Sequence, residues 1–127
     1  MIDYKKTFTQ VAKKVLTGEN RRTEIVSLAF VSEEEIKKLN RKFRKKNKPT
    51  DVLSFALNER KYLGEVVICQ KIVKLNAGRY KVSVKEEMIK LFIHGVLHLL
   101  GYDHEINEEE AKLMEQKEKF YLSKINL

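Results

Sequence analysis

Three histidines, all that the 127-residue chain contains, lie within one stretch that reads His-Gly-Val-Leu-His-Leu-Leu-Gly-Tyr-Asp-His over residues 94–104. His94 and His98 are four residues apart, so on a helix both imidazoles project from the same face, one turn from each other. Gly101 follows at a position where glycine lets the chain reverse after a helix, and this turn can bring His104 back toward the other two. Three imidazoles without a fourth protein ligand are typical of an open, catalytic zinc site. We therefore predict that these three histidines bind one Zn²⁺ ion.

The alternative for these histidines is a role as hydrogen-bonded core residues, which is the commoner role of a single histidine on an apolar helix. Here two of the three project from a helix whose residues between Met88 and Leu100 are otherwise apolar, apart from Lys90. An unpaired imidazole is costly in such surroundings. One metal ion would satisfy all three side chains together, so the sequence favours the metal site.

The spacing His-x-x-x-His-x-x-Gly-x-x-His matches the ligand pattern of the metzincin proteases, which carry a glutamate directly after the first histidine as general base. This chain has Gly95 at that position. Without the carboxylate, peptide hydrolysis lacks a proton acceptor for the metal-bound water. Asp103 and Glu105 are close in the sequence and could act as bases, although Asp103 is expected to orient a ligand or the turn instead. A divergent protease therefore stays an alternative.

A run of basic residues, uninterrupted by any acidic residue, lies between Ile36 and Lys48. Its eight members are Lys37, Lys38, Arg41, Lys42, Arg44, Lys45, Lys46 and Lys48. Such a run is often only a solvated helix face, but this one continues into a predicted loop over 44–48, where functional residues concentrate. Residues 103–118, by contrast, hold seven acidic and two basic residues. The segregated charge gives a phosphate backbone a preferred place to lie, and we expect it to contact Lys42, Lys45, Lys46 and Lys48.

The elements that must position these residues are predicted from apolar periodicity and from capping residues. The first half of the chain holds a helix over 4–16 ended by Gly18, a strand over 23–31 and a helix from Ser32 past Phe43. Two strands follow over 52–57 and 63–69, and they could form a hairpin. The rest is helical, with a short helix over 70–79, a nearly all-apolar helix from Ser83 to about Leu100, and a final helix from Asn107 into the last residues. This order predicts an α+β fold, in which helices pack on a small mixed β-sheet and one of them is a metzincin-like zinc helix.

Composition narrows the classes of protein. The length and the 43% of hydrophobic residues suit a single domain over residues 1–127. Cys69 has no partner for a disulfide within the chain, which points to a reducing cytoplasm. We find no apolar run long enough to span a membrane, and residues 1–6 lack the apolar core of a signal peptide, so we expect a cytoplasmic protein. The net charge of +8 favours nucleic acid over an anionic membrane as partner, although lysine-rich surfaces can also serve solvation alone.

Three stretches together resemble the bacterial YbeY family of metal-dependent endoribonucleases, the rRNA maturation factors. They are HGVLHLLGYDH at 94–104, NKPTDVLSF at 47–55 and LGEVVIC at 63–69, and their order and spacing fit from about Thr23 to the final helix. The resemblance implies that His94, His98 and His104 bind zinc, and that Arg44, just upstream of Lys-Pro-Thr, is the family's important arginine. It also implies a single-strand-specific endoribonuclease acting in maturation of small-subunit (16S) rRNA and in ribosome quality control. Ala56, where the family commonly has proline, and Glu65, where it often has aspartate, depart from the pattern.

These features combine into a hypothesis for the mechanism. Zinc would polarise a phosphoryl oxygen or activate a water, while the Arg44 guanidinium stabilises the charge that develops on the phosphate. The lysines would contact the backbone without reading sequence, and either a 2′-hydroxyl or a metal-bound water could be the nucleophile. The expected partners are RNA, namely 16S rRNA in the small ribosomal subunit, and ribosome-associated proteins, with no membrane. Two rival interpretations stay open: a non-catalytic ribosome-assembly factor with a structural zinc, and a divergent zinc metalloprotease.

Overall fold

The fold was obtained as a computed structural model, which describes residues 4–125. Residues 1–3 and 126–127 lie outside the described part. All five belong to the expected domain, and residues 126–127 also belong to the expected final helix. The described chain forms, in order, α1 (Tyr4–Gly18), β1 (Ile25–Phe30), α2 (Glu33–Arg44), β2 (Val52–Glu59), β3 (Tyr62–Ile68), α3 (Gln70–Tyr80), α4 (Val84–Leu99) and α5 (Glu108–Ser123). Each of these elements was predicted from the sequence, within a few residues at its ends.

The three strands form one mixed sheet in the order β1-β3-β2. β1 runs parallel to β3, whereas β2 runs antiparallel to it as the predicted hairpin. The hairpin is tighter than expected, because Glu59 still pairs with Tyr62 inside the predicted connection. The turn is made at Arg60, which takes a positive φ of 55°. The α+β class with a small mixed sheet is thus confirmed.

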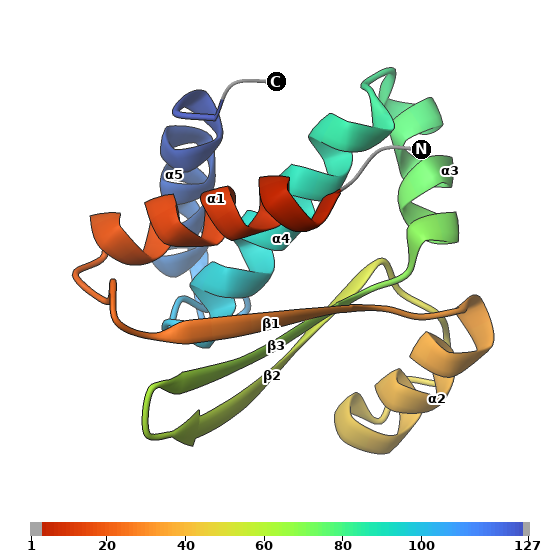
Figure 1. Ribbon diagram of the computed structural model, residues 1–127. Helices are drawn as coiled ribbons and strands as arrows, with labels where there is room; N and C mark the ends of the chain where they lie inside the picture. The colour runs from red at the N-terminus through yellow and green to blue at the C-terminus, as the bar shows by residue number, and fades with distance from the viewer. Residues whose placement is uncertain (1–3, 126–127) are drawn as a thin grey trace.

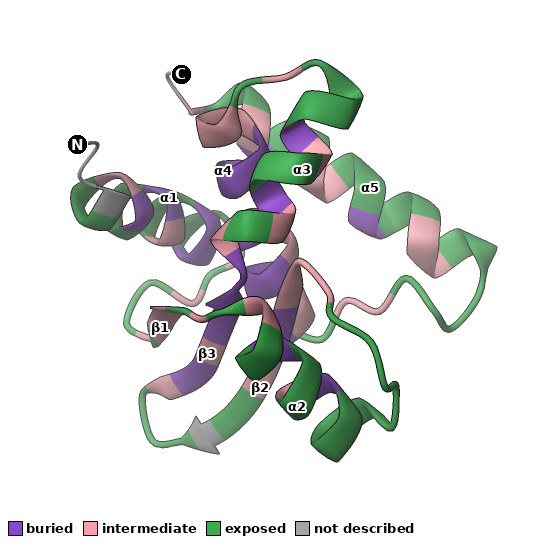
Figure 2. Cartoon of the chain, turned by 90° about the vertical axis from the view of Figure 1, so that its right-hand side faces the viewer, coloured by how far each residue is buried: buried purple, intermediate pink, exposed green. Residues whose placement is uncertain are grey.

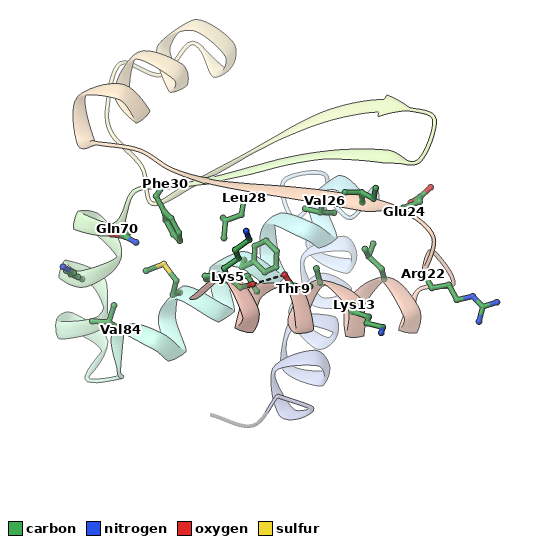
Figure 3. A pocket seen from close by; sticks show the side chains of 17 residues that line it. Lys5, Thr9, Lys13, Arg22, Glu24, Val26, Leu28, Phe30, Gln70 and Val84 are labelled. Carbon is green, nitrogen blue, oxygen red and sulfur yellow. Dashed lines mark hydrogen bonds between the residues drawn. The ribbon is translucent and has the colours of Figure 1, made fainter. Parts of the chain in front are cut away.

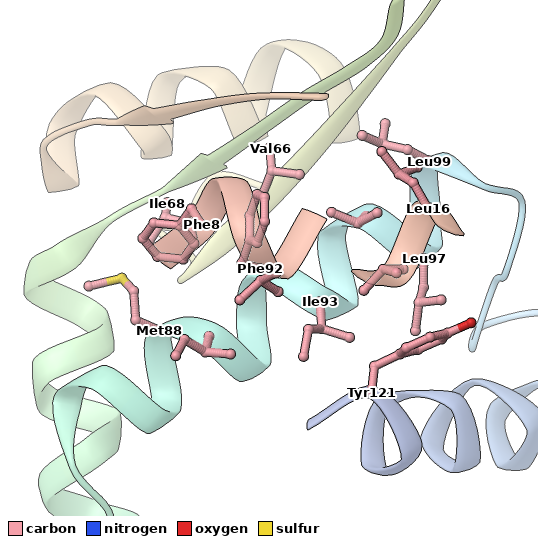
Figure 4. Packing of buried hydrophobic residues seen from close by; sticks show 14 of the residues in the cluster. Phe8, Leu16, Val66, Ile68, Met88, Phe92, Ile93, Leu97, Leu99 and Tyr121 are labelled. Atoms are coloured by element: carbon pink, nitrogen blue, oxygen red, sulfur yellow. The ribbon is translucent and has the colours of Figure 1, made fainter. Parts of the chain in front are cut away.

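The sheet has helices on both faces (Figure 1), with α1, α4 and α5 on one side and α2 on the other. The alternation of side chains along a strand explains this arrangement. On β3, Val66 and Ile68 belong to the larger core with α1 and α4, whereas Val67 packs with Ile36 of α2. Figure 4 shows Phe8 of α1 and Phe92 of α4 meeting in the larger core, with ring centroids 4.8 Å apart.

α4 is the most buried helix, as its apolar sequence predicts (Figure 2). Its buried residues are Glu87, Met88, Ile89, Phe92, Ile93, Gly95, Val96, Leu97 and Leu99. The helix begins where the Ser83 hydroxyl accepts a hydrogen bond from the Glu86 amide at 3.0 Å, and it ends before Gly101, whose φ of 107° reverses the chain. After the reversal, the Tyr102 amide donates to the Leu97 carbonyl at 3.1 Å. A rigid helix and a closed turn therefore carry the histidine stretch.

Capping side chains define the other two helices near the site. At α2, Ser32 and Glu35 form the complete predicted capping box. At α5, the Asn107 side chain accepts from the Glu110 amide at 2.8 Å, as expected for an N-cap. The basic segment and the acidic helix therefore have fixed starting points on either side of the histidine turn.

Candidate metal centre

The structure brings the three histidines of the sequence motif together. His94 and His98 project from α4, and the turn after Gly101 carries His104 back to them. The three ring centroids are 5.1, 5.1 and 5.2 Å apart, and one ligand nitrogen from each ring lies within 4.8 Å of the others. These imidazoles could therefore hold a metal ion, and the type of donor atom determines which metals fit.

His98, which is partly buried, has an electrostatic environment that suits metal coordination. Burial lowers the pKa of His98, and the neighbouring His94, His104 and Arg44 lower it further, while Asp103 opposes them. The ring is therefore neutral near pH 7, and the neutral imidazole is the form that binds metals. Three imidazole nitrogen donors fit Zn²⁺ and similar borderline ions better than Mg²⁺ or Ca²⁺, which prefer oxygen.

Glu118 of α5 contacts the centre and was missed by the sequence analysis. One of its carboxylate oxygens, Oε1, forms a short contact with Nδ1 of His94. A signal was available, because Met114, Glu118 and Tyr121 are spaced i, i+4 and i+7 and so share one face of the helix. Met114 and Tyr121 are both buried, so the glutamate lies on the inward face of α5.

Gly95 lies where the metzincin proteases carry their glutamate, and its surroundings leave no room for one. A Cβ atom at this residue would lie 2.7 Å from Val66 Cγ1 and 3.0 Å from Ser54 Oγ. The Ser54 hydroxyl also donates to the Gly95 carbonyl at 3.0 Å, so α4 packs closely against the sheet here. This position faces the sheet, and a carboxylate general base of the metzincin type has no place in this fold.

Asp103 and Glu105 are the two carboxylates that the sequence offers as possible bases, and Asp103 stabilises the turn. Its Oδ1 accepts a hydrogen bond from the Glu105 amide at 2.9 Å. Glu105 points toward the site, with Oε1 3.9 Å from Nε2 of His104 and 3.7 Å from Nη2 of Arg44. Arg44, the last residue of α2, thus lies beside the histidine trio and is ion-paired there.

A cavity of about 320 Å³ joins the basic segment to the histidines. Arg44, Lys46 and Lys48 line it together with the three histidines. Lys42 and Lys45, also expected at an RNA surface, are not among its lining residues. Lys42 Nζ lies 5.3 Å from the centroid of the Phe43 ring, and Lys45 ends α2 in the left-handed conformation with φ 56°.

Asn40 holds the basic loop against this cavity and was also missed. The residue is only 3% exposed. Its side-chain Nδ2 donates to the Lys48 carbonyl at 2.9 Å, and its own carbonyl accepts from the Lys46 amide at 3.3 Å. The available signal was its spacing of four residues from Ile36, which places the amide on the buried face of α2. The loop that carries both lysines is therefore fixed by a buried side chain.

A larger cavity, of about 1100 Å³, lies between α1, α4 and the β1 edge of the sheet (Figure 3). Its lining is mostly apolar, with Val26, Leu28 and Phe30 pointing into it from β1. None of the histidines and none of the residues of the basic loop line it. Chemistry-bearing side chains converge in the smaller cavity, which is the candidate site. Among the described helices, none is both long and apolar enough to cross a membrane.

Comparison with known proteins agrees with this arrangement. A family model described as Endoribonuclease YbeY matches residues 1–126. The chain is 44% identical over 129 residues to an Endoribonuclease YbeY of Pelotomaculum thermopropionicum, covering 94% of this chain and 84% of that protein. It is 38% identical over 123 residues to the protein of the same name from Thermotoga petrophila, covering 97% and 79%. The solution structure of TM1509 from Thermotoga maritima superposes with a TM-score of 0.69 at 37% identity, covering 93% of this chain and 78% of that one.

Proposed function

Because the chain belongs to the YbeY endoribonuclease family, we propose that it is a metal-dependent endoribonuclease that cleaves single-stranded RNA. The observation that carries the proposal is one cavity in which Arg44, Lys46 and Lys48 face the three histidines. A polyanion can lie along the cations while its phosphodiester reaches the metal centre. The family match over residues 1–126 supports a single catalytic domain over residues 1–127.

In this proposal His94, His98 and His104 hold one ion, and zinc is the metal that three neutral imidazoles favour. When bound, the zinc would supply Lewis-acid chemistry to a phosphoryl oxygen or a water. Asp103 keeps the turn closed through its bond to the Glu105 amide, so His104 stays beside the two helical ligands. The rings are thus arranged before any substrate arrives.

Arg44 is the proposed catalytic cation. Its guanidinium can bind two phosphate oxygens at once, a geometry that a lysine ammonium does not offer. Glu105 pairs with it at 3.7 Å, and both side chains are substantially exposed. An exposed pair of this kind is weak, so a phosphate can displace the carboxylate and take over the guanidinium. Lys46 and Lys48 add charge along the path of the backbone without reading bases.

The proposed substrate is the 16S rRNA of the small ribosomal subunit, matured and checked in concert with ribosome-associated proteins. The sequence resemblance and the basic character of the cavity support this assignment. Cys69 is a buried free thiol, which supports localisation in the reducing cytoplasm.

The proposal is tested by incubating the zinc-loaded and the chelated protein with a single-stranded RNA, a structured RNA and an unstructured peptide. We expect metal-dependent cleavage of the single-stranded RNA. Cleavage of the peptide alone would instead establish the protease alternative. His98→Ala distinguishes the endoribonuclease from a non-catalytic ribosome-assembly factor with a structural zinc. A folded but inactive variant indicates a catalytic metal, whereas an unfolded variant indicates a structural zinc.

A further inference from the structure

Glu118 is an acidic residue in a place where the fold would otherwise put an apolar one. It lies one turn from Met114 and one turn from Tyr121, both of which are buried in the core. Its side chain is only 16% exposed. A carboxylate that is mostly withdrawn from water loses much of its hydration, and a hydrogen-bond donor or a cation offsets that loss. The residue therefore needs a specific partner.

That partner is the metal-site histidine at position 94. The contact joins Oε1 of Glu118 to Nδ1 of His94, and the histidine side chain is itself only 24% exposed. A carboxylate accepts a hydrogen bond and cannot donate one, so the contact is a hydrogen bond only in the tautomer whose ring proton lies on Nδ1. The lone pair on Nε2 is then left for a metal ion, and the ring is held in one orientation.

The neighbouring charges on α5 do not compete for this carboxylate. Lys117 turns to α1, where its Nζ lies 3.1 Å from Oε2 of Glu19. Lys119 pairs with Glu115 at 2.9 Å on the outer surface. Since the adjacent lysines are engaged elsewhere, the contact between Glu118 and His94 is the interaction that joins α5 to the metal centre.

We propose that Glu118 is a positioning residue of the metal centre, which fixes the tautomer and orientation of His94 and strengthens it as a ligand for Zn²⁺ or Co²⁺. The inference rests on the metal site of the proposed function and adds a fourth residue, from the last helix, to its construction. Loss of a carboxylate that orients a histidine ligand typically lowers metal affinity by about 10–100-fold.

The experiment measures Co²⁺ and Zn²⁺ dissociation constants by competition with a chromophoric chelator, in the wild type and in Glu118→Gln and Glu118→Ala. The amide oxygen of glutamine can still accept the Nδ1 proton but carries no charge. We therefore expect affinity to fall in the order wild type, glutamine, alanine, with a loss of about 10–100-fold for alanine. The visible absorption of bound Co²⁺ should change in alanine, which leaves the ring free to reorient. Glu115→Ala is the matched control on the same helix, and it should leave affinity and spectrum unchanged.

Circular dichroism and thermal melting of the metal-free variants separate positioning from folding. If alanine destabilises the metal-free domain, the glutamine variant still tests the inference, because it retains shape and one hydrogen bond. Folded Glu118 variants that bind Co²⁺ as tightly as the wild type, with the same spectrum, would overturn it. A wild-type protein that binds neither metal would remove the metal centre itself, and the inference with it. RNA cleavage lost without any change in metal affinity would instead assign Glu118 a role other than the one proposed.

Discussion

At the scale of single residues, the candidate site is defined by which charges reach it. Arg44 lies 3.7 Å from Glu105 in a cavity that it shares with the histidines, whereas Arg41, one turn earlier on α2, is not among the cavity's lining residues. We expect Arg44→Ala to lower kcat on single-stranded RNA by about 10²–10³-fold, the usual effect of removing one charge-stabilising group. Metal affinity should be unchanged, because Arg44 is not a ligand.

The matched control for Arg44 is Arg41→Ala, which removes the same charge from the same helix. It should change kcat by less than a few fold. Steady-state cleavage assays on both variants, after metal content has been verified, decide the matter. Equal losses in the two variants would reduce Arg44 to a member of a diffuse basic surface.

The convergence of the three histidines could be predicted because these residues are neighbours in the sequence. A helical spacing of four and a glycine turn place all three imidazoles side by side from one short segment. Glu118 and Asn40 could not be assigned in the same way. Their partners, His94 and the Lys48 carbonyl, are 24 and eight residues away, and only the packing of helices shows which inward polar group meets which site.

At the scale of elements, the close packing of α4 on the sheet sets the position of the histidines. A methyl group at Gly95 would come within 2.7 Å of Val66 Cγ1. We expect Gly95→Ala to destabilise the fold by about 1–3 kcal/mol, as overpacking does, and to weaken metal binding by shifting the helix. Urea unfolding measures the first effect and Co²⁺ titration the second.

Gly78→Ala in α3 provides the control for this packing argument. A Cβ atom at Gly78 meets no other atom within 4 Å. Alanine is favoured over glycine inside a helix by about 0.5–1 kcal/mol, so this variant should be slightly more stable than the wild type. If both substitutions stabilise the protein, the helix has room to move away from the sheet and Gly95 is not needed for contact.

The carboxylate of Glu19, the residue after α1, links α1 to the turn after α4 and to α5. It accepts hydrogen bonds from the hydroxyls of Tyr102 and Tyr121 and from Lys117 Nζ. Burial by itself would raise the pKa of Glu19, but these three donors outweigh it, so the pKa is lowered. A carboxyl group with a lowered pKa in the folded state stabilises the fold above its unfolded pKa, near 4.3, and loses this effect as the pH falls.

Glu19→Gln should therefore reduce the free energy of unfolding by about 2 kcal/mol at pH 7, the typical value for hydrogen bonds to a charged group. The difference from the wild type should shrink as the pH falls from the unfolded pKa, near 4.3, through the lowered pKa of the folded carboxyl, below which the wild-type group is neutral as well. Urea unfolding at several pH values measures it. Glu115→Gln, at an exposed ion pair, should show little difference at any pH. A Glu19 effect that is the same at pH 7 and in acid would mean that shape, not charge, holds the three helices together.

Local sequence signals predicted the positions of the helices and strands but not how these elements pack against one another. Capping residues located α2, α4 and α5, and apolar spacing located α1, because each signal lies within the helix or a few residues from its end. For α3 the periodicity is only weak, and its N-terminus has no side-chain cap. The hairpin was predicted with too long a connection, since Glu59 and Tyr62 pair through backbone atoms that any side chain supplies. Nothing in the periodicity of α5 shows that it meets α1 through Glu19 and α4 through Glu118.

At the scale of the whole molecule, we expect RNA binding to depend on where the positive charges lie and not only on the net charge of +8. Lys46 and Lys48 line the histidine cavity, whereas Lys13 lines the larger cavity beside β1. Single-stranded RNA binding weakens with salt, with a slope of log affinity against log salt of about −0.7 for each phosphate contacted. Lys46→Ala and Lys48→Ala should each make this slope shallower by about 0.7, with little dependence on RNA sequence. Lys13→Ala changes the net charge by the same amount and should leave the slope unchanged. Fluorescence anisotropy of metal-free protein, which leaves the RNA uncut, measures all three. Equal effects in the three variants would mean that RNA responds to overall charge, whereas a selective effect of the loop lysines locates the backbone beside the metal centre.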